Sequence, residues 1–118
     1  PIAFDMKHMV ESQNNTTYSH WSKHHDYKRR WMATISQVMH AWRNVVLTYS
    51  EWSLERHYAP PHRQMDFANL VGGAKPLIDS LTDCGVIKDD NPDCFLCDYK
   101  QVADVHSYTR LILKNFSR

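Results

Sequence analysis

Hydrophobic and polar positions recur with two different periods along the chain, and these periods predict its elements. In two stretches apolar residues return every three or four positions, which is the spacing of one face of an α-helix. The first stretch runs from Tyr18 or Ser19 to about Trp42, and the second lies between Leu70 and Leu81. Four other stretches have the alternation, or the branched and aromatic content, that is typical of β-strands. We expect these strands over residues 2–10, 44–56, 94–102 and 106–115.

The elements therefore follow one another as strand, helix, strand, helix, strand, strand. This order predicts an α+β fold in which a mixed sheet of about four strands is covered by two helices. A length of 118 residues fits a single domain spanning residues 1–118.

The second helix carries residues that disfavour a regular helix. Gly72-Gly73 loosens the chain, and Pro76 cannot donate the helical hydrogen bond. We expect a distorted turn over residues 72–76, followed by a regular helix over 76–83 with Pro76 in its first turn.

Composition indicates the cellular compartment in which the protein is expected to work. No apolar run approaches the ~20 residues that a membrane-spanning helix needs. No signal peptide is visible, because Lys7 and His8 interrupt the first apolar segment. Three cysteines, an odd number, favour a reducing compartment, so we expect a cytoplasmic protein. Cys94 and Cys97 have no second pair of ligands at zinc spacing, and we interpret them as two strand residues.

Charge is distributed unevenly, although the net charge is only +1. Residues 1–64 hold eight Lys or Arg against five Asp or Glu, and residues 65–118 hold six against eight. One face of the first helix is locally basic, and such a face can hold backbone phosphates of a nucleic acid. It carries Lys23, Lys28, Arg29 and Arg30. A solvated surface is the alternative interpretation.

Carboxylates gather around the second helix more than anywhere else in the chain. Asp66 precedes this helix, and Lys75 and Asp79 lie four positions apart on one face of it. Gly85 fits the left-handed residue just past a helix end, and Asp89-Asp90 follows. Magnesium usually takes one or two protein carboxylates together with waters and substrate phosphate, so this grouping indicates a magnesium site. A surface ion pair beside an acidic turn is the alternative.

The same stretch resembles the RusA family of Holliday-junction resolvases. The resemblance is carried by a run of short matches: Asp66, Asn69-Leu70, Lys75-Pro76, Asp79-x-Leu81, Gly85-Val86-Ile87 and Asp89-Asp90. It implies a RusA-like fold and a homodimeric endonuclease that cuts four-way DNA junctions with Mg²⁺ or Mn²⁺ during recombination and repair. It also suggests phage or prophage recombination in a bacterial cell. The family usually has Asp-x-Asp-Asn where this chain has Asp66-Phe67-Ala68-Asn69, so the second acid is missing.

The resemblance also implies roles for individual residues. Asp66, Lys75 and Asp90 are the expected catalytic residues. Asp66 and Asp90 are the expected primary metal ligands, with Asp89 and Asp79 as secondary candidates. Lys75 would orient the attacking water or balance charge on the phosphate.

Two further residues complete the expected DNA-binding set, Asn15 in a polar loop and Arg63 ahead of the acidic helix. Two other functions stay open. One is a branched-DNA-binding protein that does not cut, and the other is a structural or partner-binding domain. Some aromatic residues, such as Trp31 or Trp42, are candidates for a dimer interface.

Overall fold

The computed structural model describes residues 1–12 and 21–118, with side chains described over 1–12 and 25–118. Asn15 and the side chain of Lys23 lie outside the described residues. In chain order the elements are β1 (Ile2–Met6), α2 (Trp21–Val38), the 3-10 helix η1 (His40–Trp42), β2 (Tyr49–Tyr58), α3 (Phe67–Asp83), β3 (Phe95–Ala103) and β4 (Tyr108–Ser117). Neither helix combines the length and the apolar content needed to cross a bilayer in this part of the chain.

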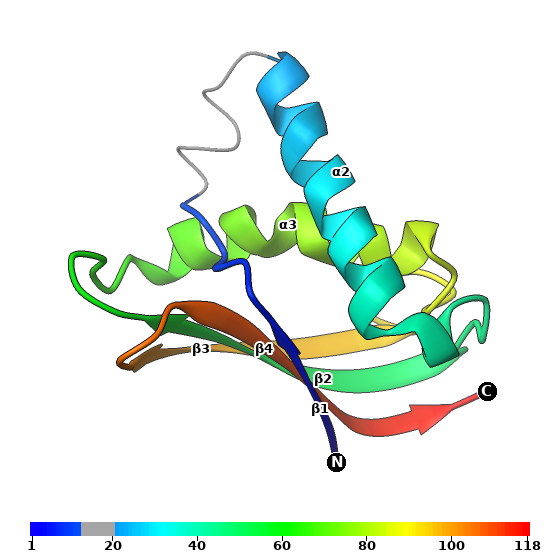
Figure 1. Ribbon diagram of the computed structural model, residues 1–118. Helices are drawn as coiled ribbons and strands as arrows, with labels where there is room; N and C mark the ends of the chain where they lie inside the picture. The colour runs from blue at the N-terminus through cyan, green and yellow to red at the C-terminus, as the bar shows by residue number, and fades with distance from the viewer. Residues whose placement is uncertain (13–20) are drawn as a thin grey trace.

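The four strands form one mixed sheet in the order β1-β4-β2-β3. β2 runs parallel to β3, whereas β4 pairs antiparallel with both β1 and β2. A parallel pair needs a crossover connection, and α3 supplies it between β2 and β3. Both helices lie over the same face of the sheet, and no helix of residues 1–12 and 21–118 covers its other face (Figure 1). This architecture confirms the predicted α+β fold with two helices on a four-stranded sheet.

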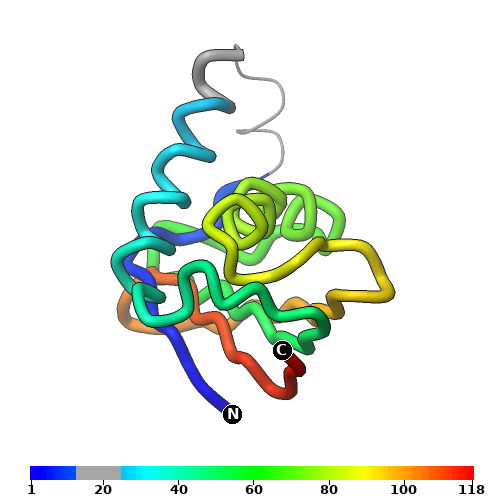
Figure 2. Tube along the Cα trace, turned by 90° about the vertical axis from the view of Figure 1, so that its right-hand side faces the viewer, coloured from blue at the N-terminus to red at the C-terminus, as the bar shows by residue number. Residues whose placement is uncertain are grey.

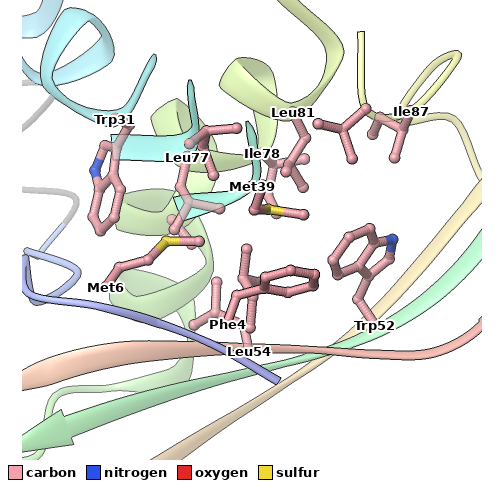
Figure 3. Close-up of a cluster of buried hydrophobic side chains, with 14 of the residues drawn as sticks. Phe4, Met6, Trp31, Met39, Trp52, Leu54, Leu77, Ile78, Leu81 and Ile87 are labelled. Carbon is pink, nitrogen blue, oxygen red and sulfur yellow. The ribbon is translucent and has the colours of Figure 1, made fainter. Parts of the chain in front are cut away.

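The core fills the layer between the helices and the sheet. Side chains from the two helices point down onto side chains from the strands (Figure 3). Trp31 is only 4% exposed within this layer, so the expectation that it serves at an interface is wrong. Trp42 is partly buried and meets the rings of Phe4 and Phe116 edge to face, at centroid distances of 6.2 and 5.4 Å.

α3 is continuous from Phe67 to Asp83, so the predicted break over residues 72–76 is wrong. Burial outweighs the local preferences of glycine and proline here. Leu70, Ala74, Leu77, Ile78 and Leu81 are all buried by packing on the sheet and on α2. Each buried large apolar side chain contributes about 1.5–3 kcal/mol, whereas one glycine in a helix costs about 1 kcal/mol and one proline about 3 kcal/mol.

Several predicted boundaries also differ from the structure: the first strand ends at Met6 rather than near residue 10, and the last runs from Tyr108 to Ser117 rather than over 106–115. α2 ends at Val38 rather than near Trp42, and η1 completes the stretch. The strand predicted from residue 44 begins at Tyr49, because Asn44 and Val46 have φ angles of 63° and 55°, which no strand accommodates. Residues 44–47 instead hydrogen-bond to the turn after α3: Val46 N–H donates to Gly85 O at 2.8 Å and Leu47 N–H to Val86 O at 2.9 Å.

Candidate functional site

The side chain of Lys75 lies between two carboxylates of the acidic segment, those of Asp79 and Asp90. Its Nζ lies 3.0 Å from Asp79 Oδ1, one helical turn away, and 2.7 Å from Asp90 Oδ2. The chain turns at Gly85 and leaves the end of α3 (Figure 2). The contact with Lys75 places Asp90 beside this helix. The hydrogen bond that Lys75 donates to Asp90, and after it the one that Lys75 donates to Asp79, raises the pKa of Lys75. These contacts bring together three of the residues expected at the site, Lys75, Asp79 and Asp90.

Asp89 shapes the turn that presents its neighbour. Its Oδ1 accepts the Asp90 N–H at 2.8 Å, and its Oδ2 accepts Asn91 Nδ2 at 2.7 Å. The Asn91 contact is the largest cause of the lowered pKa of Asp89, so the carboxylate stays ionised. The first of these bonds ties Asp89 to the backbone that carries Asp90, and the expected role of Asp89 as a secondary metal ligand stays a prediction.

A surface groove opens between α3 and the start of β3. Lys75 and Asp90 are its charged members, and the rest of its lining is mostly apolar. Val71, Ile78, Pro92, Phe95, Leu96, Cys97 and Tyr99 complete it. Burial raises the pKa of the Cys97 thiol to about 12 and also raises that of Tyr99. Both groups are therefore neutral near pH 7, and Cys97 lacks the thiolate character of a reactive cysteine.

Asp66 lies apart from the Lys75 cluster. It is the residue just before α3, and its Oδ2 accepts a hydrogen bond from Asn69 Nδ2 at 3.0 Å. Nine helical steps separate Asp66 from Lys75, which is about 13.5 Å along the helix axis. Among the residues that the structure describes, no hydrogen bond or ion pair joins Asp66 to Asp90, and a magnesium ion shared by these two acids stays a prediction. Ala68 is exposed on the first turn of α3.

The segment that leads to Asp66 is held by β3. The Gln101 amide accepts the Met65 N–H at 2.9 Å and donates to Met65 O at 2.7 Å. Buried Arg56 donates to the same Gln101 oxygen at 3.1 Å and to Arg63 O at 2.9 Å. These bonds fix the backbone next to Asp66. The sequence had not indicated this role for Gln101, since it follows only from the pairing of β2 with β3.

The predicted DNA-binding residues have different surroundings. Lys28 Nζ lies 2.8 Å from Asp83 Oδ2, so it joins α2 to α3, and this bond raises the pKa of Lys28. Arg29, Arg30 and Arg63 are exposed, and the Arg30 guanidinium sits 5.5 Å from the centre of the Tyr27 ring. Arg29 and Arg30 therefore present charge more openly than Lys28 does.

The carboxylate oxygens of Asp79 and Asp90 are ligands that suit a hard divalent cation, although these two residues are few for a metal site. Asp79 and Asp90 each direct one oxygen to the same point, which the Lys75 ammonium holds. Two carboxylates completed by waters is a common magnesium arrangement. Over residues 1–12 and 25–118, no group of three or more His, Cys, Asp or Glu side chains is placed to hold a metal ion.

No protein-family model matches the chain, and no curated protein matches its sequence. The function is therefore argued below from the residues of the site and their geometry.

Proposed function

We propose that this protein is a Mg²⁺-dependent, structure-selective endodeoxyribonuclease that resolves four-way DNA junctions in recombination and repair. The observation that carries the proposal is the Lys75 ammonium held between Asp79 and Asp90 in an open groove. Phosphodiester hydrolysis needs oxygen ligands for a metal ion and a cation for the charge that develops on phosphate. The cluster supplies both kinds of group within one site.

Asp79 and Asp90 are the residues that would hold Mg²⁺ beside Lys75. The sequence resemblance also implies Asp66 as a ligand, but Asp66 lies about 13.5 Å from Lys75 along the helix axis and would have to approach the cluster to share the ion. When bound, the ion lowers the pKa of a coordinated water and offsets charge on the phosphate. Asp89 keeps Asp90 directed toward the groove through the bond to the Asp90 N–H. The ion pairs hold the two carboxylates together before any ion binds.

In this proposal the ammonium of Lys75 binds an oxygen of the phosphate that is cut. An ammonium has three donors, and the two carboxylates take two of them. The third is available for a phosphate oxygen, where a positive charge stabilises the transition state more than the ground state. With 58% of its side chain exposed, Lys75 is accessible to a DNA backbone.

Exposed arginines on α2 support binding of DNA. Arg29 and Arg30 lie on the basic face of this helix, and contacts to phosphate need no base recognition. Such contacts fit a protein that recognises the shape of branched DNA and not an extended sequence.

Binding and cutting are tested on one immobile four-way junction and on a linear duplex of the same length. In EDTA the protein is expected to bind the junction at least about tenfold more tightly than the duplex, which corresponds to about 1.4 kcal/mol. After Mg²⁺ is added, paired nicks in opposed strands are expected. Equal affinity for the two DNAs, or no binding to either, would remove the junction as the substrate.

A second candidate function is a branched-DNA-binding protein without nuclease activity. Ala68 favours it, because an acid is usual at this position in the family that the sequence resembles. Selective junction binding in EDTA with no product after Mg²⁺ or Mn²⁺ is added would support this second function over the first.

A further inference from the structure

A second surface groove, here called the Trp42 groove, lies where the end of β4 meets η1. Both segments lie at the same end of the molecule (Figure 1). The rings of Trp42 and Phe116 meet edge to face with their planes 88° apart, so they form two walls of a notch and not one flat platform. The lining consists of four apolar residues and one arginine: Ala41, Trp42, Val45, Phe116 and Arg118. None of them lines the groove that contains Lys75.

Exposed apolar side chains gather around the Trp42 groove. Three segments meet at the Trp42 ring: β1 through Phe4, the chain on both sides of η1, and β4 through Phe116. Four of the seven large apolar side chains that are exposed in the described part of the chain belong to these segments, namely Ile2, Val38, Val46 and Phe116. An exposed apolar surface with a polar rim is typical of a binding site for another molecule.

The loop after η1 has an unfavourable backbone conformation that keeps Val46 at the surface. The φ angle of Val46 is 55°, and the residue is 44% exposed. A β-branched residue rarely adopts a positive φ, because its Cβ crowds the backbone. The hydrogen bond from Val46 N–H to Gly85 O, at 2.8 Å, holds the loop in this conformation. Such strained positions concentrate at binding sites, which supports a binding role for this end of the molecule.

The chain around the groove is positively charged. From η1 to the start of β2, and after Leu113 in β4, it holds three Lys or Arg and no Asp or Glu. Lys114 is already paired with Asp98 at 3.0 Å. Among residues 1–12 and 25–118, no carboxylate side chain pairs with Arg43 or Arg118. Two free guanidinium groups beside an apolar notch complement a ligand that carries both carboxylates and an apolar side chain.

We propose that the Trp42 groove binds an acidic peptide segment of a partner protein. One aromatic or branched side chain of the peptide occupies the notch, and its carboxylates pair with Arg43 and Arg118. A single-stranded nucleic acid is also attracted by cations, but its bases stack on open, flat ring faces. The perpendicular rings of Trp42 and Phe116 suit a compact side chain better. The proposal does not depend on the nuclease activity, since the two grooves have no residue in common.

Peptide binding is measured in the absence of DNA by fluorescence anisotropy. The labelled peptides have the sequence Asp-Glu-Asp-Phe-Leu-Asp-Glu, or the same sequence with Trp or Ile in place of Phe. At least one is expected to bind with a dissociation constant below about 100 μM. Matched peptides have Asn and Gln in place of the acids, or Gly in place of both apolar residues. They are expected to bind at least about tenfold more weakly, because each lacks one of the two complementary groups.

Charge reversal tests the two arginines and leaves the apolar walls intact, because both arginines are exposed. The double variant Arg43→Glu, Arg118→Glu is expected to weaken peptide binding by at least about tenfold. The double variant Lys7→Glu, Lys100→Glu makes the same charge change at two exposed lysines outside the groove. This control should bind the peptides as tightly as the unchanged protein does.

The indole N–H signals in NMR spectra locate the bound peptide. The peptide is expected to shift the signal of Trp42, which a Trp42→Phe variant identifies. The signals of Trp31 and Trp52 should not move, because these side chains are only 4% and 0% exposed.

Several results would overturn the proposal. These are no binding of any acidic peptide, equal binding of the neutral peptides, undiminished binding by the double arginine variant, or an unshifted Trp42 signal. An oligothymidine that shifts the Trp42 signal at lower concentration than the peptides do would assign the groove to nucleic acid. Self-association of the unchanged protein that the double arginine variant loses would assign it to a second copy of the chain. Either result would also overturn the proposal.

Discussion

Single residues decide how the acidic segment can act, and Ala68 is the clearest case. Its side chain is exposed on the first turn of α3, two positions after Asp66. A carboxylate at this exposed position would add an oxygen that can coordinate a metal ion. A negative charge in the first turn of a helix is also favourable, by about 0.3–1 kcal/mol.

We predict that Ala68→Asp raises the rate of Mg²⁺-dependent junction cutting by at least about tenfold, because one more carboxylate strengthens metal binding. Single-turnover assays over a range of Mg²⁺ concentrations measure the effect, which should include a lower half-saturating concentration. Ala68→Asn is the matched control of the same shape without charge. An aspartate variant that cuts no faster than the asparagine variant would exclude a metal-binding role for this position.

Gly85 is the residue that turns the chain from α3 toward the Asp89-Asp90 pair. Its φ is +72°, and an added Cβ would lie 2.7 Å from Asn44 Oδ1. We predict that Gly85→Ala lowers the free energy of unfolding by about 2 kcal/mol or more, since the left-handed backbone alone costs about 1–2 kcal/mol for a residue with a Cβ. Urea unfolding measures this. Asn44→Gly in the same chain should recover part of the loss, whereas no loss from Gly85→Ala would show that the turn relaxes freely.

Local chemistry in the sequence predicted these residues well. The glycine past the helix end, the Lys75–Asp79 spacing and the acidic turn could each be recognised from a few neighbouring positions. Gln101 could not, because its contact with Met65 joins residues that are 36 positions apart. Such a contact depends on which strands pair, and hydrophobic periodicity does not contain that information.

At the scale of elements, α3 shows where local preference and packing disagree. Gly72, Gly73 and Pro76 predicted a break, yet the helix is unbroken, because a continuous apolar face is buried along it. The α2 helix and the four strands were predicted in type and order, and their ends were less accurate. The strand start at Tyr49 could not be predicted from branched residues at 45–47, since Val46 and Leu47 pair with the turn after α3.

The start of α3 depends on β3 through Gln101. We predict that Gln101→Ala reduces junction cutting more than junction binding in EDTA, because the backbone that carries Asp66 loses two hydrogen bonds. Gln101→Glu keeps the acceptor for Met65 N–H and Arg56, so it should cut at an intermediate rate. Single-turnover rates and EDTA affinities of the three proteins measure this. Equal losses of binding and cutting in the alanine variant would indicate general unfolding and not misplacement of Asp66.

We predict that the basic residues of α2 contribute unequally to phosphate binding, Arg29 and Arg30 more than Lys28. Replacing Arg29 and Arg30 with alanine should lower the slope of log affinity against log salt by about 1.8, at about 0.9 per phosphate contact on duplex DNA. Lys28→Ala should lower it by less than about 0.9, because Asp83 already partners this lysine. Junction titrations at several salt concentrations measure both slopes. Unchanged slopes would identify this face as a solvated surface.

At the scale of the whole molecule, the parallel pairing of β2 with β3 creates the site. It places α3 above the sheet between these strands, and it brings the turn after α3 back to Lys75 (Figure 1). The sequence predicted a mixed sheet under two helices but not the strand order. Consequently it gave no indication that β3 is an edge or that a groove forms beside it.

The central claim is that the Lys75–Asp79–Asp90 cluster cuts DNA, and one comparison tests it most directly. Cutting of a four-way junction in Mg²⁺ is measured under single-turnover conditions for the unchanged protein, Asp90→Asn and Asp93→Asn. Asp93 is an exposed acid of the same loop, so the control makes the same charge change outside the cluster. We predict that Asp90→Asn cuts at least about 100-fold more slowly while its junction affinity in EDTA is unchanged, because a metal ligand is lost. Cutting by Asp90→Asn at the rate of the Asp93→Asn control would contradict the claim.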